Sequence, residues 1–436
     1  MFAASQPITP FTEPLDAVAS VPGSKSHTNR VLACAGLAAG RSEISGVLFA
    51  DDTEAMMGVL RTIGVSITAD PSTRRVSVDG VGGRVRPGPL ALDFRQSGTT
   101  ARFAATIVGL GSGRYRLDGD PQLRERPMGP VVEVLESLGA TADGHRLPFT
   151  VETSGLRPGT VRLAGSTSSQ FLSGLLLAAP YARPQAGTSD GGKTSEGSSI
   201  QIEIVDELVS KPYVDLTIAT MAAFGVEVEN HGYRRFVVPA GQYSASTITV
   251  EPDASAASYF FAAAAIVGGR VRVEGLGHQS LQGDVAFVDV LEQMGAVVHK
   301  GPDWVEVEGT GQLRGVNVDM SAISDTAQTL AVVASYADSP TTVTGIDFIR
   351  HKETDRVAAV VTELNKRHIK ATEDPDGFTI YPGEPTPGVV DTYDDHRMAM
   401  SFSLLGLRHH GIVIDNPQCV TKTFPQFFTA LESLRA

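Results

Sequence analysis

The chain repeats one pattern of polar and apolar positions six times. In each copy a short polar cluster leads into an Ala-rich apolar stretch long enough for a helix. The clusters are anchored at His27, Gly98, Ser168, Ser255, Asp325 and His396, with separations of 71, 70, 87, 70 and 71 residues. Self-similarity at a fixed period indicates that one structural unit is used repeatedly. The pattern therefore predicts six related units.

A second set of segments alternates with these clusters. Each begins with polar or charged residues, continues as an amphipathic helix and ends in an alternating strand. The segments are 52–69, 126–143, 211–229, 284–299, 352–373 and 422–435. In most copies a glycine follows the helix as a predicted C-terminal cap, at Gly64, Gly139, Gly225 and Gly295. Each unit is therefore predicted to run strand, helix, strand, helix and strand pair, which is an α/β (α+β) fold.

The one long interval contains residues 183–199, which are rich in Gly, Ser, Thr, Asp and Lys and almost free of apolar residues. This composition predicts a flexible, dispensable loop insertion. The Pro/Gly break at 238–241 divides the six units into two groups of three. We expect one lobe of residues 22–241 and a second of 1–21 plus 242–436, while the first strand, 15–21, could pair with either lobe.

Composition narrows the class of protein further. With 436 residues, 42% hydrophobic and 19% charged, the chain suits two or three globular domains. Its net charge of −13 provides no overall positive field for nucleic acid or an anionic membrane surface. Apolar runs reach about nine residues, against the ~20 needed to span a bilayer, and no signal-peptide pattern opens the chain. We expect a cytoplasmic protein, in which Cys34 and Cys419 form no disulfide framework.

The candidate chemistry lies at predicted helix starts, where free backbone N–H groups and the helix dipole favour anions. For Ser255 and Asp52 taken alone, a plain N-cap is the commoner explanation. Basic residues at such positions oppose the dipole and need another reason. The segment GSKSHTNR at 23–30 places Lys25 and Arg30 around one helix start, which favours a bound oxyanion. It lacks the spacing of a Walker phosphate loop.

Three other clusters leave alternatives open. Residues 124–127 open another predicted helix, with Pro127 in its first turn, and their arginines could be surface charge. Residues 352–356 combine a lysine, a carboxylate and an arginine, which suits phosphate binding beside proton transfer as well as a solvated helix start. His396 among aspartates gives weak support for a metal and equal support for a structural histidine.

The ordered clusters resemble one family closely, the 5-enolpyruvylshikimate-3-phosphate synthases among the enolpyruvyl transferases. The matching segments run nearly end to end: GSKSHTNR at 23–30, SGTTAR at 97–102, RERPMG at 124–129, STSSQF at 166–171, SKPYVD at 210–215, SDTAQTLA at 324–331, HKETDR at 351–356, YDDHRMAM at 393–400 and TKTFP at 421–425. The resemblance implies an inverse α/β barrel fold, with two lobes of three βαβαββ units and an active site between them.

The resemblance also implies the reaction. The carboxyvinyl group of phosphoenolpyruvate passes to the 5-hydroxyl of shikimate 3-phosphate through a tetrahedral intermediate, in the shikimate pathway to chorismate and aromatic amino acids (EC 2.5.1.19). The resemblance implies no metal and no organic cofactor. The expected partners are the two small-molecule substrates, and the expected oligomeric state is a monomer. The catalytic residues would be Asp325 as base, Glu353 as acid at the methylene carbon, and Lys25 at the phosphate. Closure of the lobes would exclude water.

Binding residues are carried over by position. The implied shikimate 3-phosphate set is Lys25, Ser26, Arg30, Ser168, Ser169, Gln170, Ser210, Tyr213, Asp325 and Lys352. The implied phosphoenolpyruvate set is Lys25, Gln96, Gly98, Thr99, Arg126, Gln170, Arg356, Arg397 and Lys422.

Some positions depart from the commonest family pattern. Gln96 stands where many members have Asn, and Phe103 stands where Pro or Leu is usual. We expect altered affinity rather than loss of function. Gly98 is retained, so no methyl group fills the adjacent space, and we expect glyphosate to compete with phosphoenolpyruvate.

Three other functions are alternatives to this one. The related transferase acting on UDP-N-acetylglucosamine has Lys-Asn in place of Lys25-Ser26 and usually a reactive cysteine within 124–128, and this chain has neither. A non-catalytic anion-binding scaffold would have lost a proton-transfer residue, whereas all three are present. An enzyme acting on a specialised shikimate-like acceptor stays open.

Overall fold

The computed structural model describes residues 4–183 and 199–435. The chain divides into two compact units: unit 1 comprises Met1–Pro22 and Glu251–Ala436, and unit 2 comprises Gly23–Val250. The backbone therefore passes between the units twice, after Pro22 and after Val250. The loop insertion predicted at 183–199 lies, apart from its two end residues, outside the described part of the chain.

Unit 2 contains three four-stranded sheets with the same strand order. The middle repeat consists of β6 (Leu90–Asp93), α3 (Gly98–Val108), β7 (Gly113–Asp118), α5 (Gly129–Ser137), β8 (Thr141–Ala142) and β9 (Phe149–Thr153). Strand β6 pairs in parallel with β7, and β9 pairs antiparallel with both β7 and β8. This is the predicted order of strand, helix, strand, helix and strand pair.

The other two repeats of unit 2 follow the same plan. One consists of β14 (Thr247–Thr249), α1 (Lys25–Leu37), β3 (Ala39–Ser45), α2 (Asp51–Thr62), β4 (Ser66–Asp70) and β5 (Arg75–Val81). The other consists of β10 (Gly159–Leu163), α6 (Ser169–Ala178), β11 (Ile200–Ile204), α7 (Lys211–Ala223), β12 (Glu229–His231) and β13 (Arg235–Val238). A short helix, α4 (Pro121–Arg124), precedes α5 in the middle repeat.

Unit 1 repeats the plan with one modification. Its first two repeats are β2 (Leu15–Ala19), α8 (Ala254–Val267), β15 (Gly269–Glu274), α9 (Phe287–Met294), β16 (Val297–Lys300) and β17 (Trp304–Gly309), then β18 (Asn317–Asp319), α10 (Ala327–Ala334), β19 (Thr341–Thr344), α11 (Arg356–Lys366), β20 (Ala371–Asp374) and β21 (Gly377–Ile380). The last contains β22 (Gly388–Val390), α12 (His396–Ser403), β23 (Ile412–Asp415), η7 (Pro417–Lys422) and α13 (Phe427–Glu432). There β1 (Ser5–Pro7) closes a three-stranded sheet.

Three strands are supplied from outside their own repeat, and β1 is the first of them. Strand β2 precedes all six helix pairs in sequence, yet it pairs in parallel with β15 of unit 1. Strand β14 fills the equivalent place beside β3 in unit 2. Residues 242–250, which the sequence analysis assigned to the second lobe, therefore lie in unit 2, and the Pro/Gly break at 238–241 precedes the last strand of that unit rather than ending it.

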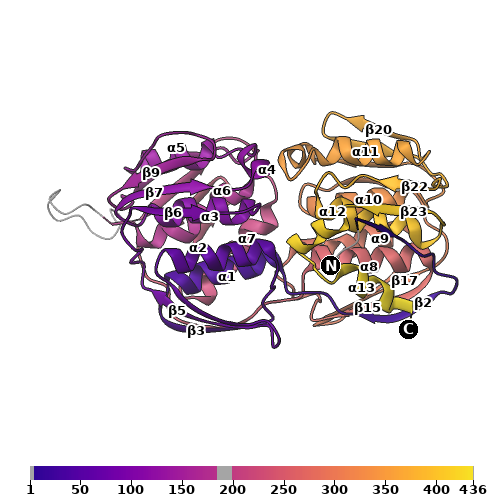
Figure 1. The fold of residues 1–436 in the computed structure, drawn as a ribbon, viewed down its shortest axis with the longest axis horizontal. Coiled ribbons are helices and arrows are strands. Elements are labelled where there is room, and N and C mark those ends of the chain that lie inside the picture. Colours follow the sequence, from indigo (N-terminus) through magenta and orange to yellow (C-terminus); the bar gives the residue numbers. More distant parts are fainter. Residues whose placement is uncertain (1–3, 184–198, 436) are drawn as a thin grey trace. The chain divides into compact units, whose positions relative to one another are not determined.

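Helices form the interior of each unit, with sheets outside them. In unit 2, α1 packs on α2, α7 and β5, and α3 packs on α6 (Figure 1). The Ala-rich helix α8 of unit 1 is buried from Ala254 to Ile266, because small side chains allow close approach on all sides. Gly295 ends α9 with a φ of 113°, the left-handed conformation that a glycine cap supplies.

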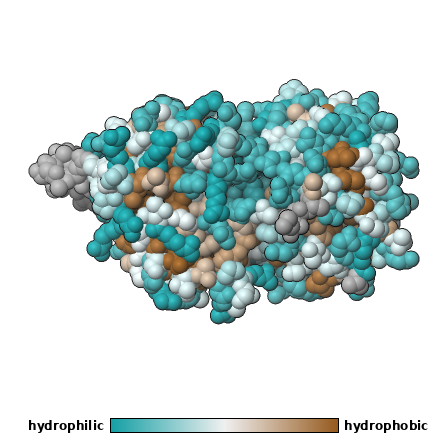
Figure 2. Space-filling view, viewed as in Figure 1, coloured by the Kyte–Doolittle hydropathy of each residue, from teal (hydrophilic) through white to brown (hydrophobic). Residues whose placement is uncertain are grey.

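The face shown in Figure 2 is predominantly hydrophilic, with hydrophobic residues in small groups. In the described part of the chain the exposed large hydrophobic residues are Val18, Val205, Leu281, Val297 and Val389, which are widely separated in the sequence. Within residues 4–183 and 199–435, no helix combines the length and apolar character that a membrane crossing requires.

Candidate active site

Unit 1 contains a buried ionic cluster centred on Arg356, the first residue of α11. Its side chain is 2% exposed. The Arg356 guanidinium donates to Asp395 (Nε to Oδ2, 2.8 Å), to Glu353 (Nη2 to Oε2, 2.7 Å) and to Asp325 (Nη1 to Oδ1, 3.3 Å). Burial alone lowers the pKa of Arg356, but attraction by these three carboxylates outweighs burial and holds that pKa above its usual value. Arg356 is therefore a fixed cation.

Two more cations complete this cluster. Arg397, in the first turn of α12, donates to the other oxygen of Asp325 (Nη2 to Oδ2, 2.6 Å). Lys422, at the end of η7, lies 4.0 Å from Glu353 (Nζ to Oε1). Asp325 thus bridges two guanidinium groups, and Glu353 lies between a guanidinium and an ammonium group. Three cations face three carboxylates, so the formal charges balance.

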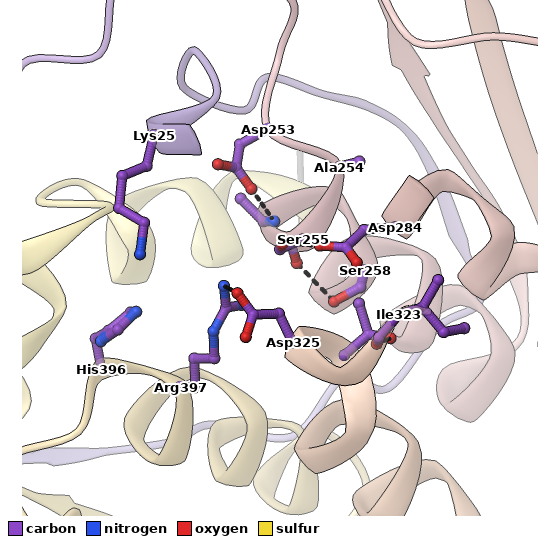
Figure 3. A network of polar contacts seen from close by, with 12 residues as sticks. Lys25, Asp253, Ala254, Ser255, Ser258, Asp284, Ile323, Asp325, His396 and Arg397 are labelled. Atoms are coloured by element: carbon purple, nitrogen blue, oxygen red, sulfur yellow. Dashed lines mark hydrogen bonds and ion pairs between the residues drawn. The ribbon is translucent and has the colours of Figure 1, made fainter. Parts of the chain in front are cut away.

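Helix starts bring these side chains together. Asp395 caps α12 by accepting from the backbone N–H of Arg397 at 2.8 Å, and Asp355 caps α11 by accepting from Ala358 at 3.0 Å. The Asp395 carboxylate also accepts hydrogen bonds from the Arg356 guanidinium. One carboxylate therefore caps α12 and also holds the first residue of α11. Figure 3 shows Arg397 and Asp325 pointing toward each other.

Ser255 does not act as the N-cap that its sequence position suggested. Asp253 caps α8 by accepting from Ala256 at 2.9 Å, and the Ser255 hydroxyl donates to the buried Asp284 carboxylate instead (Figure 3). In unit 2, Asp52 is likewise not a cap. It lies inside the first turn of α2 and pairs with Lys25 (Oδ2 to Nζ, 3.6 Å). The N-cap prediction for these two residues is wrong, because their partners come from other helices.

A second cluster surrounds the start of α3 in unit 2. A Cβ atom on Gly98 would lie 2.4 Å from Nη1 of Arg102 and 2.5 Å from Nη1 of Arg126. Arg102 donates to the Gln170 side chain at 3.1 Å, and the Gln170 amide donates to Thr99 at 3.2 Å. Two guanidinium groups, a hydroxyl and an amide therefore gather around a helix N-terminus, which is a setting for an anion.

A third cluster is built on Arg30, also in unit 2. Its guanidinium donates to the Thr217 hydroxyl (2.7 Å), to the backbone carbonyls of Ser26 (2.8 Å) and Tyr213 (3.0 Å), and to the Ser173 hydroxyl (3.3 Å). All four acceptors are neutral. Burial lowers the pKa of Arg30 to about 10, which still leaves the group charged near neutral pH.

Most of the remaining candidates lie at helix starts, whereas Lys352 directly follows the 3-10 helix η5 (Asp347–His351). Ser168 caps α6 by accepting from Gln170 at 3.3 Å, and Ser169 follows it, 4% exposed. Ser210 precedes α7 with a left-handed φ of 53°. The Lys352 ammonium lies 5.9 Å from the Phe348 ring, and Gln96 directly precedes Ser97, the cap of α3.

The segment 124–127 differs from its prediction. Arg124 ends the short helix α4 and pairs with Asp118 at 2.9 Å on the surface, and α5 begins only at Gly129. Pro127 thus lies before α5 rather than in its first turn. Arg126 is 7% exposed and faces Gly98, so only Arg124 is surface charge.

Three residues that hold these clusters are not among the candidates from the sequence. They are Asp395, Arg102 and Thr217, which contact candidate residues from different repeats. Asp395 and Arg102 belong to matched segments, but local pattern does not show which residues they contact. Among the described residues, no group of His, Cys, Asp and Glu could hold a metal ion.

Comparison with known structures defines the class of fold. An EPSP synthase from Acinetobacter baumannii superposes with a TM-score of 0.80 at 26% identity, covering 99% of this chain and 98% of that one. The enolpyruvyl transferase NikO from Streptomyces tendae gives 0.77 at 18% identity, covering 99% and 97%, which supports the fold alone. The chain has the enolpyruvyl transferase fold, with buried cations at its helix starts.

Sequence comparison identifies the family. The model of EPSP synthase (3-phosphoshikimate 1-carboxyvinyltransferase) matches residues 11–431. Relatives described as 3-phosphoshikimate 1-carboxyvinyltransferase include one from Nostoc punctiforme, 46% identical over 427 residues and 97% of both chains, and one from Sulfurovum, 46% identical over 424 residues. The chain therefore belongs to the EPSP synthase family and has its activity, EC 2.5.1.19, in the shikimate pathway to aromatic amino acids. The predicted family, fold class and activity are confirmed.

Proposed function

We propose that the ionic cluster of unit 1 carries the proton transfers of this reaction. Asp325 accepts the proton of the 5-hydroxyl of shikimate 3-phosphate as that oxygen bonds to C2 of phosphoenolpyruvate. Glu353 donates a proton to the methylene carbon, which becomes a methyl group. The bond from C2 to the phosphate oxygen then breaks, and the departing phosphate takes up the proton that Asp325 had accepted. Glu353 recovers a proton from the methyl group as the double bond re-forms.

The pairing of Asp325 with two guanidinium groups carries this proposal. Phosphoenolpyruvate brings a phosphate and a carboxylate, which are strong partners for guanidinium and ammonium groups. We expect these anions to bind Arg356, Arg397 and Lys422, which contact Asp325 and Glu353. Binding would therefore bring phosphoenolpyruvate beside the proposed base and the proposed acid.

The clusters of unit 2 supply further binding groups. We assign Gln96, Gly98, Thr99, Arg126 and Gln170 to phosphoenolpyruvate, with Lys25 assisting at its phosphate. The proposed shikimate 3-phosphate ligands are Lys25, Ser26, Arg30, Ser168, Ser169, Gln170, Ser210, Tyr213, Asp325 and Lys352. The four neutral acceptors around Arg30 support this assignment, because they leave its charge for a substrate anion.

A phosphate-release assay tests the function and the roles together. With phosphoenolpyruvate present, phosphate release should occur with shikimate 3-phosphate and not with shikimate or UDP-N-acetylglucosamine. Asp325→Asn and Glu353→Gln should each lower kcat by about 10²- to 10⁴-fold. In deuterated water, only Glu353→Gln should also abolish deuterium entry into unreacted phosphoenolpyruvate. Deuterium entry at the parent rate in that variant would assign the acid elsewhere.

Two coarser proposals accompany the reaction. The enzyme acts as a monomer in the cytoplasm, and the predominantly hydrophilic face in Figure 2 supports the monomer. Light scattering that gave twice the chain mass at micromolar concentration would contradict the monomer.

A further inference from the structure

Arg30 is a buried cation stabilised without a carboxylate. It is 2% exposed, and in the described part of the chain no ion pair joins it to Asp or Glu. Buried charges are normally paired. The neutral acceptors receive four hydrogen bonds from its five N–H groups but carry no opposite charge. Another source of electrostatic stabilisation is therefore needed.

Two aromatic rings supply it. The Arg30 guanidinium carbon lies 5.3 Å from the Phe103 ring centroid and 5.9 Å from that of Tyr213. Both separations fall within the ~6 Å range of cation–π attraction, which is stronger when the groups are desolvated. Phe103 is completely buried in α3, so the contact between its ring and the Arg30 guanidinium is shielded from solvent.

A ring and a carboxylate would act differently here. A carboxylate would neutralise Arg30 and compete with an incoming anion. The negative face of an aromatic ring stabilises the cation while leaving its full charge. A leucine at position 103 could fill much of the same space but has no such face.

We propose that Phe103 is a positioning residue for the acceptor substrate: its ring holds the Arg30 guanidinium charged and in place to bind an anionic group of shikimate 3-phosphate. The inference rests on the proposed role of Arg30. It also assigns a function to one of the two departures from the common family pattern. Phe103 acts through Arg30, so its substitution should affect the acceptor and not phosphoenolpyruvate.

The test compares three substitutions. Phe103→Leu should raise the Kd of shikimate 3-phosphate, measured by calorimetry without the second substrate, by about 5- to 20-fold. The KM of phosphoenolpyruvate and kcat at saturating acceptor should stay within about twofold. Replacement of Phe103 by 3,4,5-trifluorophenylalanine weakens the ring's negative face at nearly constant size and should weaken acceptor binding in the same direction. Phe149→Leu in β9 is the control, because it removes a similar volume from a core position 1% exposed.

The outcomes separate the inference from the proposed function. If Arg30→Gln leaves acceptor binding unchanged, the role of Arg30 is wrong. If Arg30→Gln weakens binding but Phe103→Leu does not, Arg30 binds the acceptor and the inference about Phe103 fails. Equal increases for both substrates, or an effect of leucine without any effect of fluorination, would show that Phe103 contributes only packing.

Discussion

At the scale of single residues, the proposed anion-binding groups are held by contacts between helix starts. Lys25 and Asp52 are one such contact, with side chains 12% and 4% exposed. Anion binding alone would suggest that removing Lys25 relieves repulsion and leaves the fold intact. The structure shows a buried ion pair instead, and breaking such a pair is costly because one charge loses its partner.

A double-mutant cycle measures this pair. Lys25→Met should lower both activity and the free energy of unfolding, the latter by about 2–4 kcal/mol. Asp52→Asn in the Lys25→Met background should restore part of the stability but not the activity. Urea unfolding and phosphate release give the two readouts. Additive stability losses would show that the pair is not coupled.

Because Gly98 has no side chain, the ends of Arg102 and Arg126 can lie close to the start of α3. A methyl group there would meet the ends of Arg102 and Arg126, both flexible side chains that can move. We therefore expect Gly98→Ala to fold normally but to raise the KM of phosphoenolpyruvate by about tenfold, the equivalent of ~1.4 kcal/mol. The KM of shikimate 3-phosphate should change little.

Glyphosate inhibition gives a second readout on the same variant. If glyphosate occupies the space beside Gly98, its inhibition constant should rise by at least as much as the KM. Unchanged inhibition in Gly98→Ala, or insensitivity of the parent to a large excess, would refute that placement.

At the scale of elements, α11 fixes the turn that carries Asp395. Glu363, completely buried in α11, accepts from the backbone N–H of Asp391 (3.1 Å) and from the Tyr393 hydroxyl (2.8 Å). Two turns earlier on the same helix, Arg356 binds Asp395 itself. Between these anchors, Tyr393 and Asp394 both adopt a left-handed φ of 54°, a conformation that side chains disfavour. The helix thus holds a strained turn at two points.

Loss of the Glu363 anchor should disturb the cluster from a distance. Glu363→Ala leaves three donors without this acceptor, namely the Asp391 N–H, the Tyr393 hydroxyl and the Lys366 ammonium. It should cost about 2–4 kcal/mol of stability, with a lower kcat because Asp395 shifts. Tyr393→Phe removes only one hydroxyl and should cost about 1 kcal/mol. Thermal unfolding and steady-state kinetics test both. Glu363→Ala with the parent's kcat would show that Arg356 alone positions the turn.

The sequence predicted most elements because their signals are local. The polar clusters, the helical spacing and the glycine caps each depend on a few neighbouring residues, and the period near 70 only compares such local clusters along the chain. The role of Asp395 depends on Arg356, 39 positions earlier in the chain, and that of Phe103 on Arg30. Such pairings arise from packing between repeats, so local pattern could mark the helix starts but could not identify their partners.

At the scale of the whole molecule, the sequence could not show which unit receives each first strand. β2 and β14 are similar short strands, and parallel pairing connects residues far apart in the chain. The structure places β14 with unit 2, where Tyr243, in the segment just before it, is completely buried against Tyr181 and Phe224. The Tyr243 hydroxyl also donates to the Leu177 carbonyl at 3.0 Å.

This arrangement predicts that unit 2 folds by itself from one continuous segment. Residues 23–250 contain all twelve strands of its three sheets, so a fragment of that length should unfold cooperatively. A fragment of residues 23–241 lacks β14 and Tyr243, which exposes the edge of β3 and leaves a cavity beside Tyr181. Loss of a buried aromatic residue costs about 3–5 kcal/mol, a large share of a domain's stability. Circular dichroism should show a sharp thermal transition for the longer fragment and a broad or absent one for the shorter. Equal transitions would move the boundary of unit 2 back to residue 241.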